Sequence, residues 1–139
     1  MSQQPVRGIS RHGLDAAFEA EEARKSELIL AARLLREQGQ DEAAADKFAA
    51  AAEIEEHLAD VCDGKGLAEK SFVHRFSAAS CWAQACNFYH AIALCDDLLS
   101  YTGVPDRLRR RVDDYAHTLR NRRAQWYAGL ALEPTATET

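Results

Sequence analysis

An alanine-rich stretch in the first half of the chain constrains the fold more than any other segment of the sequence. Residues 39–54 read GQDEAAADKFAAAAEI, and seven of these sixteen residues are alanine. Alanine has the highest helix propensity of all residues, and its methyl side chain leaves room for a neighbouring helix. One large side chain, Phe48, stands among the small ones. The stretch predicts a helix that packs closely against other helices, with Phe48 filling a gap between repeated units.

The remainder of the chain also favours helices. Alanine, leucine, glutamate and arginine dominate, and the runs of Val, Ile and Thr that are typical of strands are absent. Three prolines and seven glycines mostly mark junctions between segments. Apolar residues at helical spacing predict an all-α protein of about five antiparallel helices. Their expected ranges are 14–38, 41–62, 67–86, 88–100 and 106–127. They form a single domain over residues 13–130, between a flexible N-terminus at 1–12 and a flexible tail at 131–139.

The sequence favours a cytoplasmic location. It contains no apolar run of about 18 residues that could cross a membrane, and the opening residues MSQQPVRGISRHG lack the apolar core of a signal peptide. We therefore expect no contact with a membrane, and we expect reduced cysteines.

The cysteines predict no metal site. Cys62, Cys81, Cys86 and Cys95 form no C-x-x-C pair. Cys81 and Cys86 are five residues apart, a spacing that points two side chains of one helix in different directions. We expect four buried thiols that act as small apolar side chains, and no metal or cofactor.

An internal correspondence appears when Ala44 is aligned with Ala91, an offset of 47 residues. Each of these alanines follows a turn residue, Gly39 or Cys86. A pair of small residues lies seven and eight positions before each turn residue, and a bulky residue lies four positions before it. The matched positions are Ala31/Ala78, Ala32/Ala79, Leu35/Trp82, Gly39/Cys86, Ala44/Ala91, Phe48/Cys95 and Ala51/Leu98. The chain therefore predicts two similar helical hairpins at about 25–58 and 72–105.

These matched residues resemble the tetratricopeptide (TPR) helix-turn-helix repeat over about half of the chain. The resemblance implies stacked antiparallel hairpins, here two, closed by a last helix that acts as a cap. It also implies a concave groove for a partner, lined by first-helix residues that do not pack internally. In this chain those positions are Ser26, Ile29, Arg33, Arg36, Val73, Phe76, Ser80, Ala83 and Gln84. Arg33 and Arg36 would suit an acidic or carboxylate-bearing ligand.

Charge is distributed unevenly along the chain, whose formal net charge is −5. Residues 1–63 carry seven Lys/Arg against fourteen Asp/Glu, whereas residues 64–139 carry ten against eight. Seven arginines fall in residues 106–123. This basic helix is a second candidate surface for an acidic partner, with Arg107, Arg110 and Arg111 as binding residues. Nucleic acid is disfavoured as its ligand, because the net charge is negative and stacking aromatics are not interleaved with the arginines.

Catalytic signatures are weak. The sequence has no nucleophile elbow, zinc-protease pattern or glycine-rich phosphate loop. One arrangement suggests an alternative: Arg111 and His117, in RVDDYAH, resemble the Arg-x(4–6)-His motif of HEPN ribonucleases. That resemblance implies that both side chains act on the RNA 2′-hydroxyl and the scissile phosphate. Val112 stands where that motif has a polar residue.

We therefore predict a non-catalytic adaptor that binds a partner protein, for example a larger effector or enzyme. Binding would use the TPR-like groove or the basic last helix. Two alternatives are left open, namely a HEPN-like ribonuclease that uses Arg111 and His117, and a structural protein that forms homo-oligomers.

Overall fold

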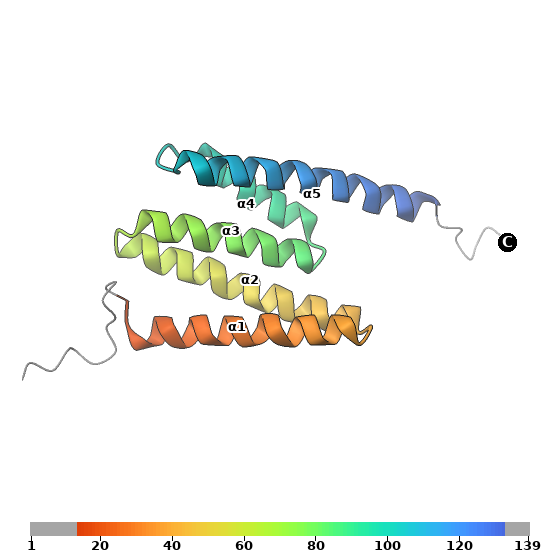
Figure 1. Cartoon of the computed structure of the whole chain (residues 1–139), viewed down its shortest axis with the longest axis horizontal. Helices are drawn as coiled ribbons and strands as arrows, with labels where there is room; N and C mark the ends of the chain where they lie inside the picture. Colours follow the sequence, from red (N-terminus) through yellow and green to blue (C-terminus); the bar gives the residue numbers. More distant parts are fainter. Residues whose placement is uncertain (1–13, 133–139) are drawn as a thin grey trace, which may run out of the picture.

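The computed structural model describes residues 14–132, and this part of the chain is all-α, with five helices and no strand. Consecutive helices pack as adjacent antiparallel pairs (Figure 1). They are α1 (Ala16–Glu37), α2 (Asp41–Gly64), α3 (Ala68–Gln84), α4 (Phe88–Ser100) and α5 (Asp106–Leu132). The predicted number and order of helices are confirmed. The last helix is longer than expected, because it continues to Leu132 instead of ending near Tyr127. The tail predicted at 131–139 begins inside this helix, and residues 1–12 and 133–139 lie outside the described residues.

The alanine-rich stretch lies in α2, which packs against α1 on one side and against α3 on the other. Ala44, Ala51 and Ala52 are fully buried or nearly so. Ala51 and Ala52 contact Cys81 of α3 in a small apolar cluster that also takes side chains from α1. Because α2 has a close neighbouring helix on each of two sides, it needs small residues on both of these faces. This explains the large number of alanines. Phe48 is also buried, beneath the guanidinium of Arg36, 4.6 Å from its ring centre.

The turns after α1 and α3 have the same hydrogen bonds. Gly39 N donates to Arg36 O at 3.0 Å and Gln40 N to Leu35 O at 2.9 Å. After α3, at the offset of 47 residues, Cys86 N donates to Ala83 O and Asn87 N to Trp82 O, both at 2.9 Å. Gly39 and Cys86 both have positive φ, 76° and 64°. This is the left-handed residue that ends many helices. The correspondence at the offset of 47 residues therefore holds in the backbone. The turn after α2 has the same bonds, from Gly66 N to Asp63 O at 3.1 Å and from Leu67 N to Cys62 O at 2.9 Å, and Gly66 has a φ of 72°, so this turn is not specific to the two hairpins.

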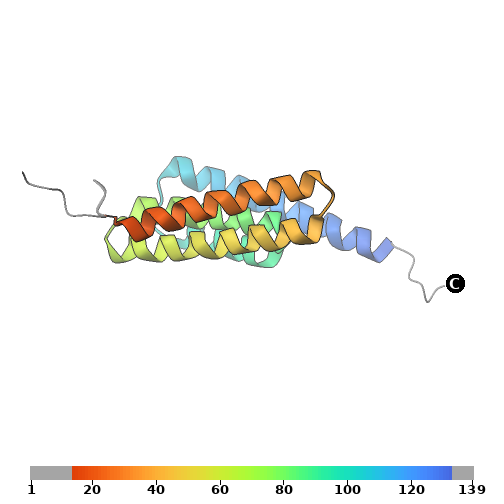
Figure 2. The ribbon, with the colours of Figure 1, turned by 90° about the horizontal axis from the view of Figure 1, so that it is seen from below.

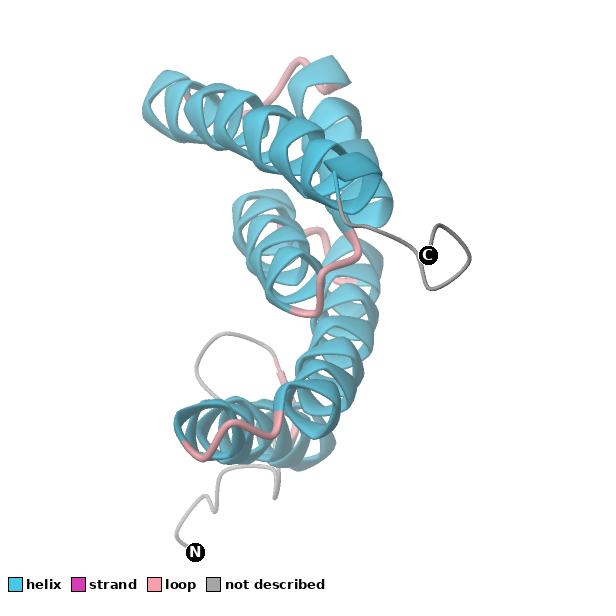
Figure 3. Ribbon diagram, turned by 90° about the vertical axis from the view of Figure 1, so that its right-hand side faces the viewer, coloured by secondary structure: helices cyan, strands magenta, loops and turns pink. Residues whose placement is uncertain are grey.

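The odd-numbered helices contact one another in one row, and the even-numbered helices contact one another in a second row. In the first row, Arg36 of α1 bonds Gln84 of α3, and Phe76 of α3 meets Tyr115 of α5 edge-on at 5.5 Å. In the second row, Glu56 of α2 lies 3.1 Å from His90 of α4. Seen end-on in Figure 3, the helices follow one another along a curve. The structure thus has two different faces, an odd-helix face and an even-helix face.

The larger apolar core joins α3, α4 and α5, and a smaller one joins the start of α1 to α2. Leu98, Val112 and Leu119 are fully buried in the larger core. Among the described helices, none combines the length and the apolar character that a membrane span requires.

Candidate functional site

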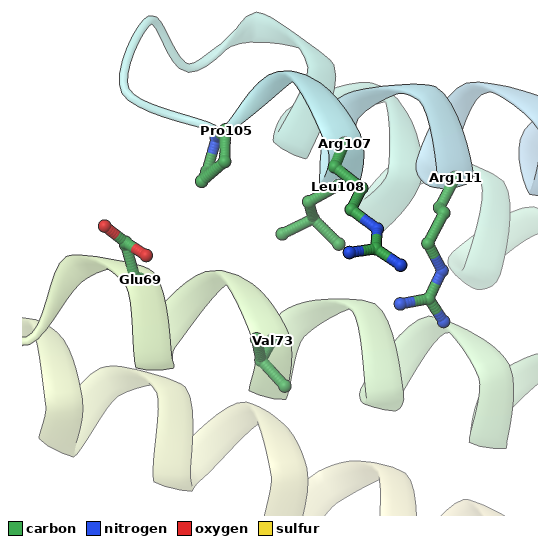
Figure 4. Close-up of a pocket in the computed structure, with 6 residues that line it drawn as sticks. All are labelled: Glu69, Val73, Pro105, Arg107, Leu108 and Arg111. Atoms are coloured by element: carbon green, nitrogen blue, oxygen red, sulfur yellow. The ribbon is translucent and has the colours of Figure 1, made fainter.

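A groove lies between α3 and α5 on the odd-helix face (Figure 4). We call it the α3–α5 groove; its volume is about 260 Å³, and its walls are Glu69 and Val73 of α3 and Pro105, Arg107, Leu108 and Arg111 at the start of α5. In Figure 4 the two guanidinium groups extend from α5 toward α3. Val73 is 54% exposed although it is aliphatic. The groove therefore combines an apolar surface with two cations and with one carboxylate, that of Glu69.

Two of the seven arginines of α5 donate hydrogen bonds to α4 or to the residue after it. Arg109 donates to the carbonyls of Leu99 and Tyr101, which are at the end of α4. Arg120 makes two hydrogen bonds to Asp96, at 2.7 and 2.9 Å. Among the side chains of residues 14–130, no ion pair joins Arg107 or Arg111 to a carboxylate. Their positive charges are therefore available to a ligand.

Aromatic contacts hold the middle of the odd-helix face. The guanidinium of Arg111 lies over the ring of Phe76, 5.5 Å from its centre, and Phe76 packs edge-on against Tyr115. Burial raises the pKa of Tyr115 and outweighs the hydrogen bond with Ser80 and the charge of Arg122, which lower it. The Tyr115 hydroxyl therefore stays protonated near neutral pH. Arg111 is held by a cation–π contact that leaves its N–H groups free to bind an anion.

A second, larger recess lies at the other end of α3. We call it the end recess; its volume is about 530 Å³ and it is lined by Arg36, Asp41, Ala45, Ala83, Gln84, Cys86, Phe88, Arg122 and Trp126. Arg36 donates to the side chain of Gln84 at 2.8 Å and to its backbone carbonyl at 3.2 Å. The ring of Trp126 meets Phe88 edge-on, with 6.2 Å between the ring centres. Like the first groove, this recess combines apolar walls with arginines.

The structure brings some of the predicted binding residues together and not others. Val73, Arg107 and Arg111 share the α3–α5 groove, so the two surfaces predicted from the sequence meet in one place. Arg36 and Gln84 are joined at the end recess, and Phe76 and Ser80 lie between the two hollows, where both contact Tyr115. The remaining candidates line none of the hollows described here: Ser26, Arg33 and Arg110 are exposed, and Ile29 is half-buried against the Ala51 cluster.

Three residues near these hollows, Tyr115, Arg122 and Trp126, were not predicted as binding residues. A signal for them exists in the sequence, because α5 carries arginines and aromatics at spacings of four, four, seven and four residues, which place them on one helix face: Arg107, Arg111, Tyr115, Arg122 and Trp126. The expectation that aromatics are not interleaved with the arginines of this helix is therefore wrong for this face.

A buried ionic cluster was also missed. The side chain of Glu55 in α2 is 2% exposed, and its carboxylate lies 2.7 Å from Nδ1 of His74 and 3.5 Å from Nζ of Lys25. A buried carboxylate of this kind needs such partners. The cluster joins α1, α2 and α3 and lies apart from both hollows.

The cysteines differ from one another. Cys62, Cys81 and Cys95 are buried as predicted, and burial raises the pKa values of Cys81 and Cys95 to about 11. The prediction is wrong for Cys86, which is exposed because it occupies the left-handed position of a turn instead of a helix interior. Within residues 14–130, no three His, Cys, Asp or Glu side chains are arranged to bind a metal ion.

The two residues of the ribonuclease alternative have different surroundings. Arg111 lines the α3–α5 groove and packs over Phe76. His117 is exposed and lies 3.9 Å from Asp113, and it does not line that groove. Neither contact tests the ribonuclease hypothesis, and no observation favours it.

Comparisons with known proteins identify no relative. No family model, no curated protein and no solved structure matches the chain.

Proposed function

We propose that this chain is a cytosolic, non-catalytic, TPR-like interaction module that binds an acidic segment of a partner protein in the α3–α5 groove. The observation that carries the proposal is the pair Arg107 and Arg111. Both line a groove with exposed apolar side chains, and among residues 14–130 neither arginine is paired with a carboxylate. A carboxylate that enters the groove would form charge-assisted hydrogen bonds with either guanidinium.

A peptide segment fits the shape of the odd-helix face better than a small molecule does. Along α3, Glu69 and Gln84 are separated by fifteen residues, which is about 22 Å of helix. An extended peptide of about seven residues covers this length. Apolar side chains of the peptide would contact Val73 and Leu108 while its carboxylates meet the arginines. The buried small residues at matched positions, Ala44 and Ala91, support the TPR-like interpretation, and a larger effector or enzyme remains the kind of protein proposed as the source of the peptide.

The test uses neighbouring arginines of one helix. Arg107 lines the groove and Arg110 does not, yet both are exposed. A random peptide library is selected on the protein, and the recovered peptides are measured by fluorescence anisotropy against Arg107→Glu and Arg110→Glu. We expect the recovered peptides to be rich in Asp, Glu and apolar residues. Arg107→Glu should weaken their binding by about tenfold or more, corresponding to about 1.4 kcal/mol, and Arg110→Glu should leave it nearly unchanged.

Two outcomes would contradict the proposal. Equal losses in the two variants would mean that the arginines act only through the overall charge of α5 and that the groove is not the binding site. Cleavage of RNA by the protein, abolished in His117→Ala, would replace the interaction module by the ribonuclease.

A further inference from the structure

We propose that a second copy of this chain docks at the end of the molecule that holds the end recess, giving a two-fold symmetric dimer. In this dimer the protruding end of α5 from each copy lies against the end recess of the other. The proposal does not rest on the peptide-binding function, because its contacts are the end recess and the end of α5 and not Arg107 and Arg111 of the α3–α5 groove, although a peptide that reaches Gln84 would adjoin the recess.

The end of α5 protrudes because the helices that pair here differ in length. α5 has 27 residues and its antiparallel partner α4 has 13. Trp126 already lies against Phe88, the first residue of α4, so the residues that follow it extend past the end of α4. Figures 1 and 2 both show α5 extending beyond the other helices at this end. The protruding part of α5 therefore lacks a neighbouring helix in the described chain.

The protruding part is apolar as well as unpartnered. Residues 124–130, which read AQWYAGL, contain no charged side chain. Tyr127 is 62% exposed and Leu130 is 51% exposed. Leu130 continues the helical spacing of the buried Leu119 and of Trp126, which is 48% exposed, so the apolar stripe of α5 runs on beyond the core. A stripe of this kind is stabilised when another apolar surface covers it.

The end recess lies beside this protrusion at the same end of the molecule, since Trp126 and Arg122 of α5 line it together with Asp41 and Ala45 of α2. Its walls include Ala45, Ala83 and Phe88, which are apolar. One end thus has an apolar projection and a hollow with both apolar and charged walls. A surface that contains both shapes complements a second copy of itself after a two-fold rotation, and such a contact closes as a dimer instead of growing into a filament.

Charge favours the same arrangement. Arg122 and Arg123 directly precede the apolar stretch of α5, whereas Glu37, Asp41 and Glu42 are exposed where α1 leads into α2. When two copies meet at this end, the basic residues beside each protrusion approach the acidic residues of the other copy. This contact is attractive, and it occurs twice because of the symmetry.

The first experiment measures the mass of the full chain by analytical ultracentrifugation over a range of concentrations. We expect the mass to rise from 15.4 kDa toward twice that value as concentration increases, with a dissociation constant in the micromolar range because the contact is small. Leu130→Glu should weaken the dimer by about tenfold or more, because it places a carboxylate in the apolar contact. Leu30→Glu is the matched control, since Leu30 is 61% exposed on α1 and lines neither hollow.

A charge exchange tests the geometry without disturbing apolar packing. Arg122→Glu with Arg123→Glu makes the protrusion and its target both acidic, and Asp41→Lys with Glu42→Lys makes both basic. Each double variant alone should be monomeric. An equimolar mixture should form a heterodimer, because the acidic protrusion of one variant then meets the basic recess of the other and the reverse contact is complementary too.

The outcomes separate the alternatives. A wild-type chain that stays monomeric at every concentration overturns the proposal, as does a dimer that Leu130→Glu leaves intact. Loss of association in Leu30→Glu would place the contact on α1 instead. Recovery of the dimer in the mixed charge variants supports the proposal even if Leu130→Glu fails to fold. Arg107→Glu should dimerise normally, so failure of the peptide-binding proposal would be seen separately.

Discussion

The two helical hairpins, α1–α2 and α3–α4, are built on the same turn but carry different large side chains. Gly39 and Cys86 take the same left-handed position, and the buried alanines Ala44 and Ala91 follow each turn at the same distance. We call the position four residues after each of these alanines the knob position; it holds Phe48 in the first hairpin and Cys95 in the second. Both knobs are buried. The shared features are therefore those that fix the backbone.

The large residues differ because the hairpins have different neighbours. Trp82 of α3 lies between α2 and α4, donates its indole N–H to Glu56 at 2.6 Å and stacks on His90. Leu35, its counterpart in α1, makes no such bond and sits near the end of the stack, where Leu34 is 51% exposed. A central hairpin needs side chains that satisfy polar groups on both sides, whereas a terminal hairpin does not. The small residues at matched positions therefore mark the repeat, whereas the large residues reflect the neighbours of each hairpin.

The largest expected effect separates the two knob positions. Phe48→Ala should destabilise the protein by about 3–5 kcal/mol, because it leaves a cavity in the first hairpin and removes the contact with Arg36. Cys95→Ala removes a single buried sulfur and should cost only roughly 1 kcal/mol. Urea unfolding of both variants measures the two free energies, and the slope of each transition shows whether unfolding stays cooperative. Equal losses would mean that the second hairpin depends on its knob as much as the first.

The next effect tests the small positions, where the hairpins should behave alike. Ala44→Leu and Ala91→Leu should each destabilise by about 1–3 kcal/mol, because a larger side chain at a fully packed helix contact forces the helices apart. Ala23→Leu is the control, since Ala23 is exposed on α1 and should change stability little. A thermal melt of the three variants is sufficient. If Ala44→Leu melts at the wild-type temperature, the repeat interpretation loses its main support.

The fold could be predicted in outline because its determinants are local. Gly39 and Pro105 mark helix boundaries in the sequence, and the small pair before each turn identifies the hairpins. The end of α5 was not predictable in the same way, because Gly129 lies two residues after Tyr127 yet does not stop the helix, and nothing local shows that α4 is short by comparison. The exposed Cys86 was missed for a related reason, since its left-handed φ belongs to a position where glycine is usual.

The candidate site was predicted less completely, because it depends on which helices lie side by side. Arg107 and Val73 were both singled out from the sequence, but 34 positions separate them in the chain, and only the packing of α5 beside α3 joins them in one groove. The pairing of Glu55 with Lys25 and His74 is likewise a property of three helices together. A sequence pattern identifies the apolar or charged face of one helix, but it does not identify which other helix packs against that face.

The smallest expected effect exchanges the residues at the two turns. Cys86→Gly should stabilise the protein by about 1 kcal/mol, because glycine adopts positive φ without the steric cost that a Cβ atom brings. Gly39→Cys should destabilise the protein by about the same amount, because a Cβ atom is unfavourable at positive φ. No steric clash adds to this cost, since a Cβ at Gly39 would meet no atom within 4 Å. The double exchange should therefore melt close to the wild type if the turns are equivalent. Urea unfolding of all three variants checks this. A double variant clearly less stable than the wild type would show that Cys86 does more in its turn than occupy a left-handed position, and the two hairpins would then differ in their turns as well as in their knobs.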